Sequence, residues 1–248
     1  TNTSVRKYLA EFLHDWRIID TSRWIWCPIL HGIILRVRPS RSAKKYAEVW
    51  GQPENLPNHG EGHEAPLVRI TRAQAAGLQS ALGDDVIVDV AMRYGNPSIG
   101  FALDRLMAHG CTNVAILPMY PQFSATTTAS VFDGVAKALK GRANVPTLRM
   151  LRDYHTEDDY ISALGESLYD QIKTQGWEPE VVLASFHGIP QSYVDKGDPY
   201  PLECAATTDL LRAKTGMNAD KLRLTFQSRF GPKEWLNPYT DKTLEALA

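Results

Sequence analysis

A single histidine directly follows an apolar, strand-like run in the last third of the chain. Val181–Ser185 is rich in branched and small apolar residues, and Gly188 and Pro190 end the run soon after. Such a run predicts a buried parallel strand, so His187 emerges at its carboxyl end, where ligands bind in open α/β sheets. An imidazole there can accept a proton near neutral pH or bind a metal ion. The alternative is a histidine with a purely structural role at the end of the strand.

Polar side chains follow three further predicted strands in the same way. Because parallel strands place their carboxyl ends at one edge of a sheet, we expect these side chains to converge on one crevice. The residues are Arg93, Tyr94, Tyr120, Ser124, His187 and Arg229.

The elements that must position these residues alternate between helix and strand after residue 70, which predicts an α/β fold with parallel sheets flanked by helices. We expect strands at 86–91, 114–117, 147–151, 181–185 and 222–226, and helices at 99–109, 156–175, 203–215 and 241–248. Ser98 is predicted to cap the first helix, and Thr156 with Asp159 to form a capping box at the second. A lobe boundary is expected near residue 176.

The net charge, the cysteines and the lengths of the apolar runs each disfavour a class of protein function. The 248 residues carry a formal net charge of −1, which provides no basic field for nucleic acid. Cys27, Cys111 and Cys204 lie far apart, which argues against disulfides, a structural zinc site or an iron–sulfur cluster and favours a reducing cytoplasm. No apolar run reaches the length of about 18 residues that a membrane-spanning helix needs.

Residues 24–35 are apolar and aromatic and are followed by Arg36 and Arg38. Pro28 and Gly32 are expected to break the segment. Tryptophan beside cationic residues suits a membrane interface or the mouth of a site for an apolar substrate. The alternative is a segment buried in the core.

Two acidic and histidine-containing segments are weaker candidates. His59–Glu64 offers two imidazoles and two carboxylates, but its glycines and the nearby prolines disfavour a helix, so a solvated loop is the better interpretation than a metal site. Asp153–Asp159 is interpreted as the start of a helix. No phosphate-binding loop and no nucleophile elbow is found.

Three long motifs, in order along the chain, resemble the ferrochelatase family, and most closely its bacterial branch. Shorter similar segments lie at 8–13, 28–32, 42–46 and 230–236, so the resemblance covers nearly the whole chain. The three motifs are residues 92–99 (MRYGNPSI), 117–130 (LPMYPQFSATTTAS) and 185–190 (SFHGIP).

The resemblance implies two similar Rossmann-like lobes with a porphyrin in the cleft between them. Residues 1–176 would form the first lobe, including an apolar lip at about residues 20–38, and residues 177–248 part of the second. The implied function is the insertion of ferrous iron into protoporphyrin IX to give protoheme, the last step of heme biosynthesis. The implied enzyme is a lyase located in the cytoplasm, with peripheral membrane contact through the lip. Iron is a substrate, and neither a resident cofactor nor an iron–sulfur cluster is expected.

The resemblance also assigns roles to residues. His187 would remove pyrrole protons and contact the iron, and Arg93 and Tyr94 would lie on the opposite side of the macrocycle. Trp235 would form a pocket wall, while Tyr46, Tyr120 and Ser124 would contact the porphyrin edge.

Two segments of the family pattern are expected outside this chain: an apolar strand before Thr3 and a glutamate after Ala248 that would face His187. One alternative is therefore a porphyrin- or metal-binding protein without catalysis. A generic Rossmann-like ligand domain is another, and coproporphyrin stays open as the substrate.

Overall fold

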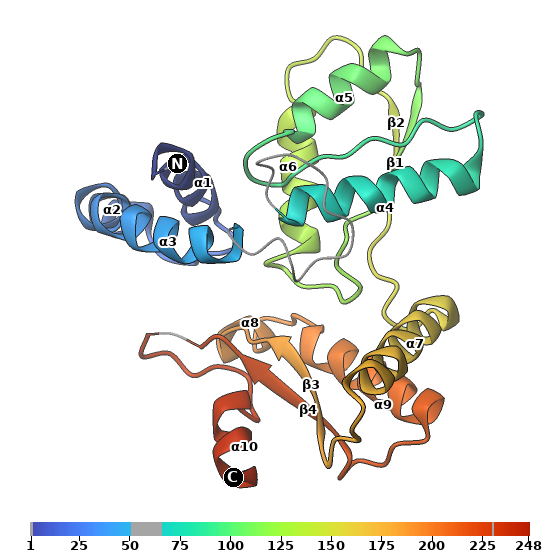
Figure 1. Cartoon of the computed structure of the whole chain (residues 1–248). Helices are drawn as coiled ribbons and strands as arrows, with labels where there is room; N and C mark the ends of the chain where they lie inside the picture. Colours follow the sequence, from blue (N-terminus) through green and yellow to red (C-terminus); the bar gives the residue numbers. More distant parts are fainter. Residues whose placement is uncertain (1, 51–65, 230) are drawn as a thin grey trace. The chain divides into compact units, whose positions relative to one another are not determined.

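The computed structural model describes residues 2–50, 66–229 and 231–248 (Figure 1). The chain forms two compact units. The first contains residues 1–114 and 130–149, and the second contains residues 115–129 and 150–248. The predicted lobe boundary at residue 176 falls inside the second unit, and the assignment of lobes stays a prediction. The segment His59–Glu64 lies outside the described residues.

The first unit begins with a small group of helices. These are α1 (Asn2–Leu13), α2 (Arg23–Ile29), the π-helical η1 (Leu30–Ile34) and α3 (Leu35–Trp50). Their apolar faces meet in a core of Val5, Leu9, Leu13, Leu30 and Leu35. This core fixes the end of α1 against η1 and α3, as expected when amphipathic helices bury one stripe each.

Three more helices belong largely to the first unit: α4 (Pro66–Leu82), α5 (Ile99–Ala108) and α6 (Thr128–Leu139). The predicted cap of α5 is confirmed, because the Ser98 hydroxyl accepts a hydrogen bond from the Phe101 N–H at 3.3 Å. The predicted strand at 86–91 is wrong, since the chain is not a strand there. The Gln79 side chain bonds instead to the Val86 carbonyl (2.7 Å) and the Val88 N–H (2.8 Å), which occupies the groups that a neighbouring strand would use.

Strands β1 (Asn113–Ile116) and β2 (Thr147–Met150) form one sheet. The Thr147 N–H donates to the Thr112 carbonyl (2.8 Å) and the Leu151 N–H to the Ile116 carbonyl (3.0 Å). Both partners advance by four residues, so the two strands are parallel. The predicted strands at 114–117 and 147–151 are thus confirmed.

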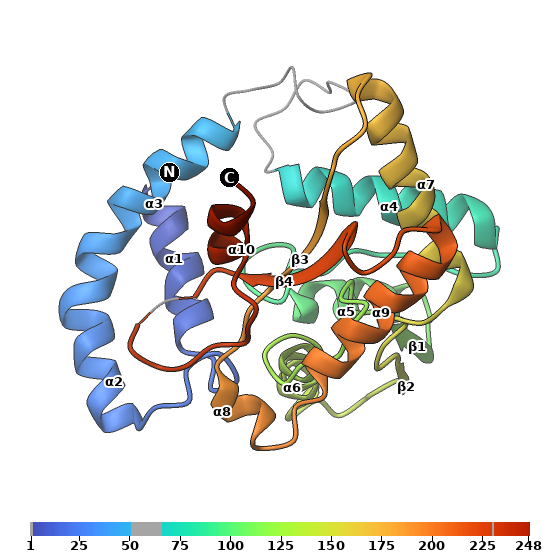
Figure 2. The same cartoon turned by 90° about the horizontal axis from the view of Figure 1, so that it is seen from below.

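The second unit is built on β3 (Val182–His187) and β4 (Leu222–Gln227), which pair in parallel (Figure 2). Helix α9 (Tyr200–Thr215) packs on β4 and on α7 (Asp158–Gln175), and α10 (Thr240–Leu247) also packs on β4. The short α8 (Gln191–Val194) follows the turn after β3. Their core contains Ile189, Cys204, Phe226 and Leu236.

The fold class predicted from the sequence is confirmed as a mixed α/β structure with two small parallel sheets flanked by helices. The capping box predicted at Thr156 is wrong, because α7 begins at Asp158 after Glu157, and no side chain caps it. The helix nevertheless ends as expected, at Gly176 in the left-handed conformation. Among the described residues, no helix combines the length and apolar character needed to cross a bilayer.

Candidate functional site

His187 is the last residue of β3, opposite Gln227 of β4, and its side chain is exposed. Its Nδ1 lies 2.7 Å from the Gly188 carbonyl oxygen. Because a carbonyl oxygen can only accept, this contact places the proton on Nδ1. The lone pair of the neutral ring is then on Nε2, which is available to take a proton or bind a metal ion.

The turn after His187 is held rigidly by its backbone. The Gly188 N–H donates to the Gln227 carbonyl at 2.8 Å, and the Leu236 N–H donates to the Ile189 carbonyl at 3.0 Å. A Cβ at Gly188 would lie 3.0 Å from the Gln227 oxygen and 3.4 Å from the ring of Trp235. A Cβ here would therefore press on the Gln227 carbonyl, and glycine allows this close approach without a shift of the backbone. The buried Trp235 (6% exposed) is packed against the same turn.

In the first unit, Arg93 and Tyr94 converge on one buried carboxylate, that of Asp15. The Arg93 Nη2 donates to Asp15 Oδ2 at 2.5 Å, and the Tyr94 hydroxyl donates to the same oxygen at 2.7 Å. The Ser130 hydroxyl completes the set at 2.5 Å. Arg93 also donates from Nε to the Ser130 carbonyl at 2.6 Å. Asp15 thus fixes the orientation of both predicted pocket residues.

Electrostatics favour the ionised form of this carboxylate. Burial alone would raise the pKa of Asp15, but hydrogen bonds from Ser130, Tyr94 and the Arg17 N–H, together with the Arg93 charge, lower it below its ordinary value. Burial raises the pKa of the Tyr94 hydroxyl, with the nearby Asp15 charge acting in the same direction. Tyr94 is therefore a neutral hydrogen-bond donor throughout the physiological pH range.

The segment after β1 carries two predicted contacts in the second unit. Tyr120 is 40% exposed, whereas Ser124 is fully buried. The Ser124 hydroxyl donates to Asp198 Oδ2 at 2.9 Å, and the Ala125 N–H donates to the same oxygen at 2.8 Å. Ser124 therefore anchors its loop to the segment before α9.

Arg229, the remaining strand-end residue, lies on the surface after β4. Its guanidinium pairs with Asp241 of α10 at 2.8 Å and lies over the Tyr239 ring, 4.1 Å from the ring centre. Hydrogen bonding to Arg229 lowers the pKa of the exposed Asp241. These contacts connect β4 to α10.

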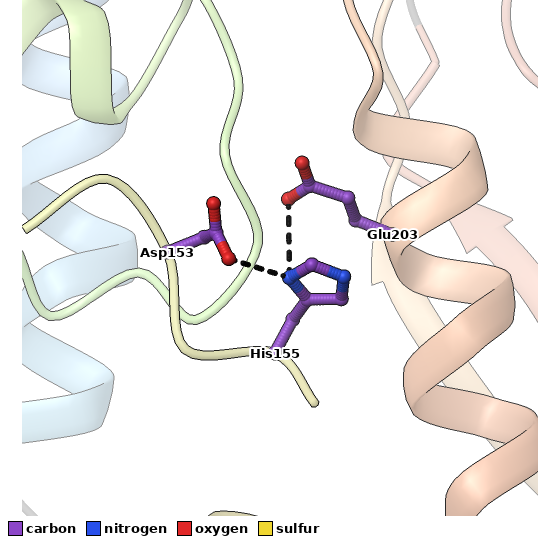
Figure 3. Close-up of side chains that lie close together, drawn as sticks. All are labelled: Asp153, His155 and Glu203. Atoms are coloured by element: carbon purple, nitrogen blue, oxygen red, sulfur yellow. Dashed lines mark hydrogen bonds and ion pairs between the residues drawn. The ribbon is translucent and has the colours of Figure 1, made fainter. Parts of the chain in front are cut away.

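A second histidine of this unit lies between two carboxylates (Figure 3). His155 Nδ1 is 3.0 Å from Asp153 Oδ1 and 3.5 Å from Glu203 Oε2. The interpretation of this segment as a helix start holds only for its last residues, because α7 begins at Asp158 after the N-cap residue Glu157 and carries Asp158 and Asp159 in its first turn. These three side chains could hold a metal ion. However, Arg152 contacts both carboxylates, and the Phe123 N–H donates to Glu203 Oε2 at 2.6 Å, so the negative charge is already compensated.

The apolar segment at 24–35 is helical. It buries some of its side chains and exposes others. Leu30 and Leu35 lie in the helical core, but Trp24, Ile25 and Ile33 are exposed by 92%, 62% and 61%. Pro28 and Gly32 do not break the segment as expected: Pro28 lies within the last turn of α2, and Gly32 lies within η1. The result is a row of exposed apolar side chains on a helix that is anchored by its opposite face.

The structure brings some predicted site residues together. Arg93 and Tyr94 lie together in the first unit, and His187 and Trp235 in the second. The convergence of all of them on one crevice stays a prediction. Tyr46 lies in α3, but its side chain is outside the described set.

Sequence reasoning missed the buried acids that order these residues. They are Asp15, Asp198 and Glu203. Their partners Ser130, Ser124 and Phe123 are 115, 74 and 80 residues away along the chain, so no local pattern marks the acids as buried.

Comparison with known proteins gives one consistent result. The family model described as Ferrochelatase matches residues 1–248. The ferrochelatase of Bradyrhizobium sp. (strain BTAi1) is 52% identical over 246 residues, which cover 98% of this chain and 68% of the relative. The ferrochelatases of Brucella canis and Brucella ovis are each 51% identical over the same shares.

Proposed function

Because the chain belongs to the ferrochelatase family, we propose that it inserts ferrous iron into protoporphyrin IX, with His187 as the catalytic residue. The observation that carries the proposal is the geometry of His187 at the end of β3. Its Nδ1–H is held by the Gly188 carbonyl, so the basic lone pair is on Nε2, and the residue is exposed.

The reaction requires a group that can accept protons and contact a metal ion, and a neutral imidazole can do both. Two pyrrole N–H protons leave the macrocycle, and one ferrous ion takes their place, so charge balances when two protons are released. Nε2 can accept a pyrrole proton and, once it is neutral again, contact the incoming iron. The rigid turn at Gly188 keeps the ring in one place, which matters because poor alignment lowers the rate of proton transfer.

We assign supporting roles to the other predicted residues. Arg93 and Tyr94 bind the macrocycle in an orientation set by Asp15. Trp235 forms an apolar wall beside the histidine turn. Tyr46 and Tyr120 contact the porphyrin edge. The Ser124 hydroxyl is already bonded to Asp198, so Ser124 acts by positioning the loop that carries Tyr120.

The test of the proposal is anaerobic turnover with ferrous iron and protoporphyrin IX, together with porphyrin binding measured by tryptophan fluorescence. We expect His187→Ala to lower turnover by about 100-fold or more, the usual contribution of general base catalysis, and to leave the porphyrin dissociation constant unchanged. His109→Ala is the matched control, since His109 is also exposed but caps α5.

Two results would overturn this proposal. Equal turnover of the wild type and His187→Ala would remove the histidine from the chemistry. Tight porphyrin binding by the wild type without any turnover would show a binding protein instead of an enzyme. A parallel assay with coproporphyrin identifies the preferred substrate.

We also propose that the exposed apolar row on α2 and η1 contacts a membrane surface. Trp24 (92% exposed) and Ile33 (61% exposed) suit insertion at the interface between headgroups and acyl chains, and Arg36 follows within one turn. Trp24→Ala should weaken cosedimentation with anionic lipid vesicles. Trp177→Ala, which removes another exposed tryptophan (60%), should not. Equal binding of both variants would contradict the proposal.

We expect no iron–sulfur cluster. Burial raises the pKa of the Cys204 thiol to about 12, which disfavours the thiolate that iron requires. Purified protein should therefore show no cluster absorbance and no stoichiometric sulfide.

A further inference from the structure

Two histidines outside the proposed active site face each other in the first unit. His14 follows the end of α1, and His31 lies in η1. Their Nε2 atoms are 3.1 Å apart, and their ring centres are 5.0 Å apart. Both side chains are exposed, so an ion from solvent can reach them.

The distance between the two nitrogens matches the distance between two ligand atoms bound to one divalent transition-metal ion. Imidazole nitrogens bind zinc at about 2.0–2.1 Å, so two ligands of one ion lie about 2.9 Å apart at a right angle and about 3.3 Å apart at the tetrahedral angle. The observed 3.1 Å lies between these values. The same distance is that of an N–H···N hydrogen bond in which His31 Nε2–H donates to His14 Nε2, so a bound ion takes the place of this proton, which passes to solvent.

Hydrogen bonding prepares His14 as a ligand. Its Nδ1 lies 2.6 Å from the Ala10 carbonyl oxygen, which can only accept, so Nδ1 carries the proton and the lone pair is on Nε2. A backbone carbonyl on the second ring nitrogen is the usual outer contact of metal-bound histidines, because it fixes the tautomer and the ring orientation.

The backbone around both histidines is held in place by the core. The Trp26 Nε1–H donates to the Leu13 carbonyl at 2.8 Å, directly before His14. Leu30, the residue before His31, is fully buried in the same core as Leu13. The two ligands are thus presented by packed segments, and η1 is π-helical, a conformation found frequently at functional sites.

Two arginines that lie near these histidines in the sequence are occupied elsewhere. Arg17 pairs with Asp133 at 2.7 Å, and the Arg23 guanidinium lies over the Trp16 ring, 4.4 Å from its centre. Each has a partner of its own.

We propose that His14 and His31 form a binding site for a divalent transition-metal ion of the zinc class, with water completing its coordination. Imidazole ligands favour zinc, copper and nickel over magnesium and calcium, which prefer oxygen ligands. Two protein ligands and an exposed position make the bound ion exchangeable. The site does not depend on the proposed iron-insertion activity.

The test is calorimetric titration of zinc into tag-free protein at pH 7.5, with magnesium as the comparison ion. We expect the wild type to bind one zinc ion more than His14→Ala or His31→Ala does. The double variant should lose no more than either single variant, because one ion needs both ligands. Magnesium should give no such difference.

His109→Ala is the matched control. The Nδ1 of His109 also contacts the carbonyl four residues earlier, that of Arg105, at 2.8 Å. In the part of the chain that the structure describes, however, no second imidazole contacts it. This variant should bind zinc like the wild type. Thermal unfolding adds a second readout, because zinc should raise the Tm of the wild type and the control but not that of the His14 and His31 variants.

His14→Asn and His31→Asn keep a polar side chain and replace the alanine variants if those fail to fold. The proposal is overturned if single variants bind as much zinc as the wild type does. It is also overturned if the losses in the two single variants add in the double variant, since that would indicate two independent sites.

Discussion

Asp15 carries the largest concentration of charge-assisted hydrogen bonds among the contacts described above, and its replacement by asparagine should destabilise the protein markedly. Its Oδ2 accepts from Arg93, Tyr94 and Ser130, while its Oδ1 accepts from the Arg17 N–H at 2.8 Å. An asparagine can keep only one acceptor oxygen. Whichever way the amide is turned, its NH₂ group faces at least one donor.

The size of the effect follows from burial. Removing one partner of a buried ion pair costs about 3–5 kcal/mol. The side chains of Asp15 and Arg93 are 4% and 22% exposed. Since Arg93 is partly solvated and keeps its bonds to Ser130, we take the lower end, about 3 kcal/mol. For a chain of this size that corresponds to a decrease in Tm of about 6–12 °C.

The assay is urea and thermal unfolding at pH 7, with Asp133→Asn as the control. Asp133 also pairs with an arginine, Arg17, but the two side chains are 52% and 41% exposed. An exposed pair contributes about 0–1 kcal/mol, so this control should stay close to the wild type. Equal destabilisation by the two variants would refute the claim that the Asp15 network is buried and specific.

The pH dependence provides an independent check. The folded-state pKa of Asp15 lies below its ordinary value of 3.8. Its stabilisation is therefore fully present above that value and is lost as the pH falls through the folded-state pKa. The stability gap between the wild type and Asp15→Asn should be constant from roughly pH 5 to 7 and narrow at lower pH. A gap that persists unchanged in acid would contradict the assignment of an ionised carboxylate.

Two further predictions concern the second unit. Gly188→Ala places a Cβ 3.0 Å from the Gln227 carbonyl oxygen, so it should destabilise the protein by about 1–3 kcal/mol, and it should lower turnover because the turn that holds the proposed catalytic histidine must shift. Gly77→Ala, in α4 with no atom within 4 Å of its Cβ, should instead stabilise by about 0.5–1 kcal/mol, and equal denaturation curves for both variants would contradict the reasoning. Cys204, fully buried with a thiol pKa of about 12, should react with a disulfide reagent at pH 8 only after unfolding, whereas the other two cysteines, which are partly exposed, should react in the native protein. Rapid native labelling of Cys204 would show that the core opens more readily than its packing indicates.

The strands predicted successfully from the sequence are those that pair with a neighbouring strand. The predicted strand at 181–185 overlaps β3 from Val182 onward, and the predicted strand at 222–226 lies within β4, where Leu222 and Phe226 are buried. The run at 86–91 has the same composition, yet Val86 and Ile87 are 43% and 44% exposed. Composition cannot separate these cases, because the difference lies in the Gln79 side chain, which takes the backbone bonds that a strand would have made.

The apolar segment around Pro28 shows a different limit. A proline lacks the N–H that would bond to the carbonyl four residues earlier, so a break was the reasonable expectation. In the structure, Pro28 is followed directly by Ile29 and then by the π-helical turn of η1, which bonds to the fifth residue instead of the fourth. The burial of Leu30 and Leu35 stabilises this continuous path, and burial is a tertiary property that sequence spacing does not show.

In the candidate site, too, residues positioned by local contacts were predictable from the sequence, and those positioned by distant contacts were not. His187 was identifiable from the sequence because everything that positions it is local: a strand, a glycine and the next carbonyl. Arg93 and Tyr94 are adjacent in a family motif, but their orientation comes from Asp15, 78 and 79 residues earlier, which lies outside the three long motifs. A motif can thus be intact in sequence while its side chains lose their orientation, because a single distant carboxylate has been replaced. Given the role proposed for Arg93 and Tyr94, we expect Asp15→Asn to weaken porphyrin binding, measured by tryptophan fluorescence, without changing any motif residue, whereas Gly188→Ala should act on turnover through the local turn.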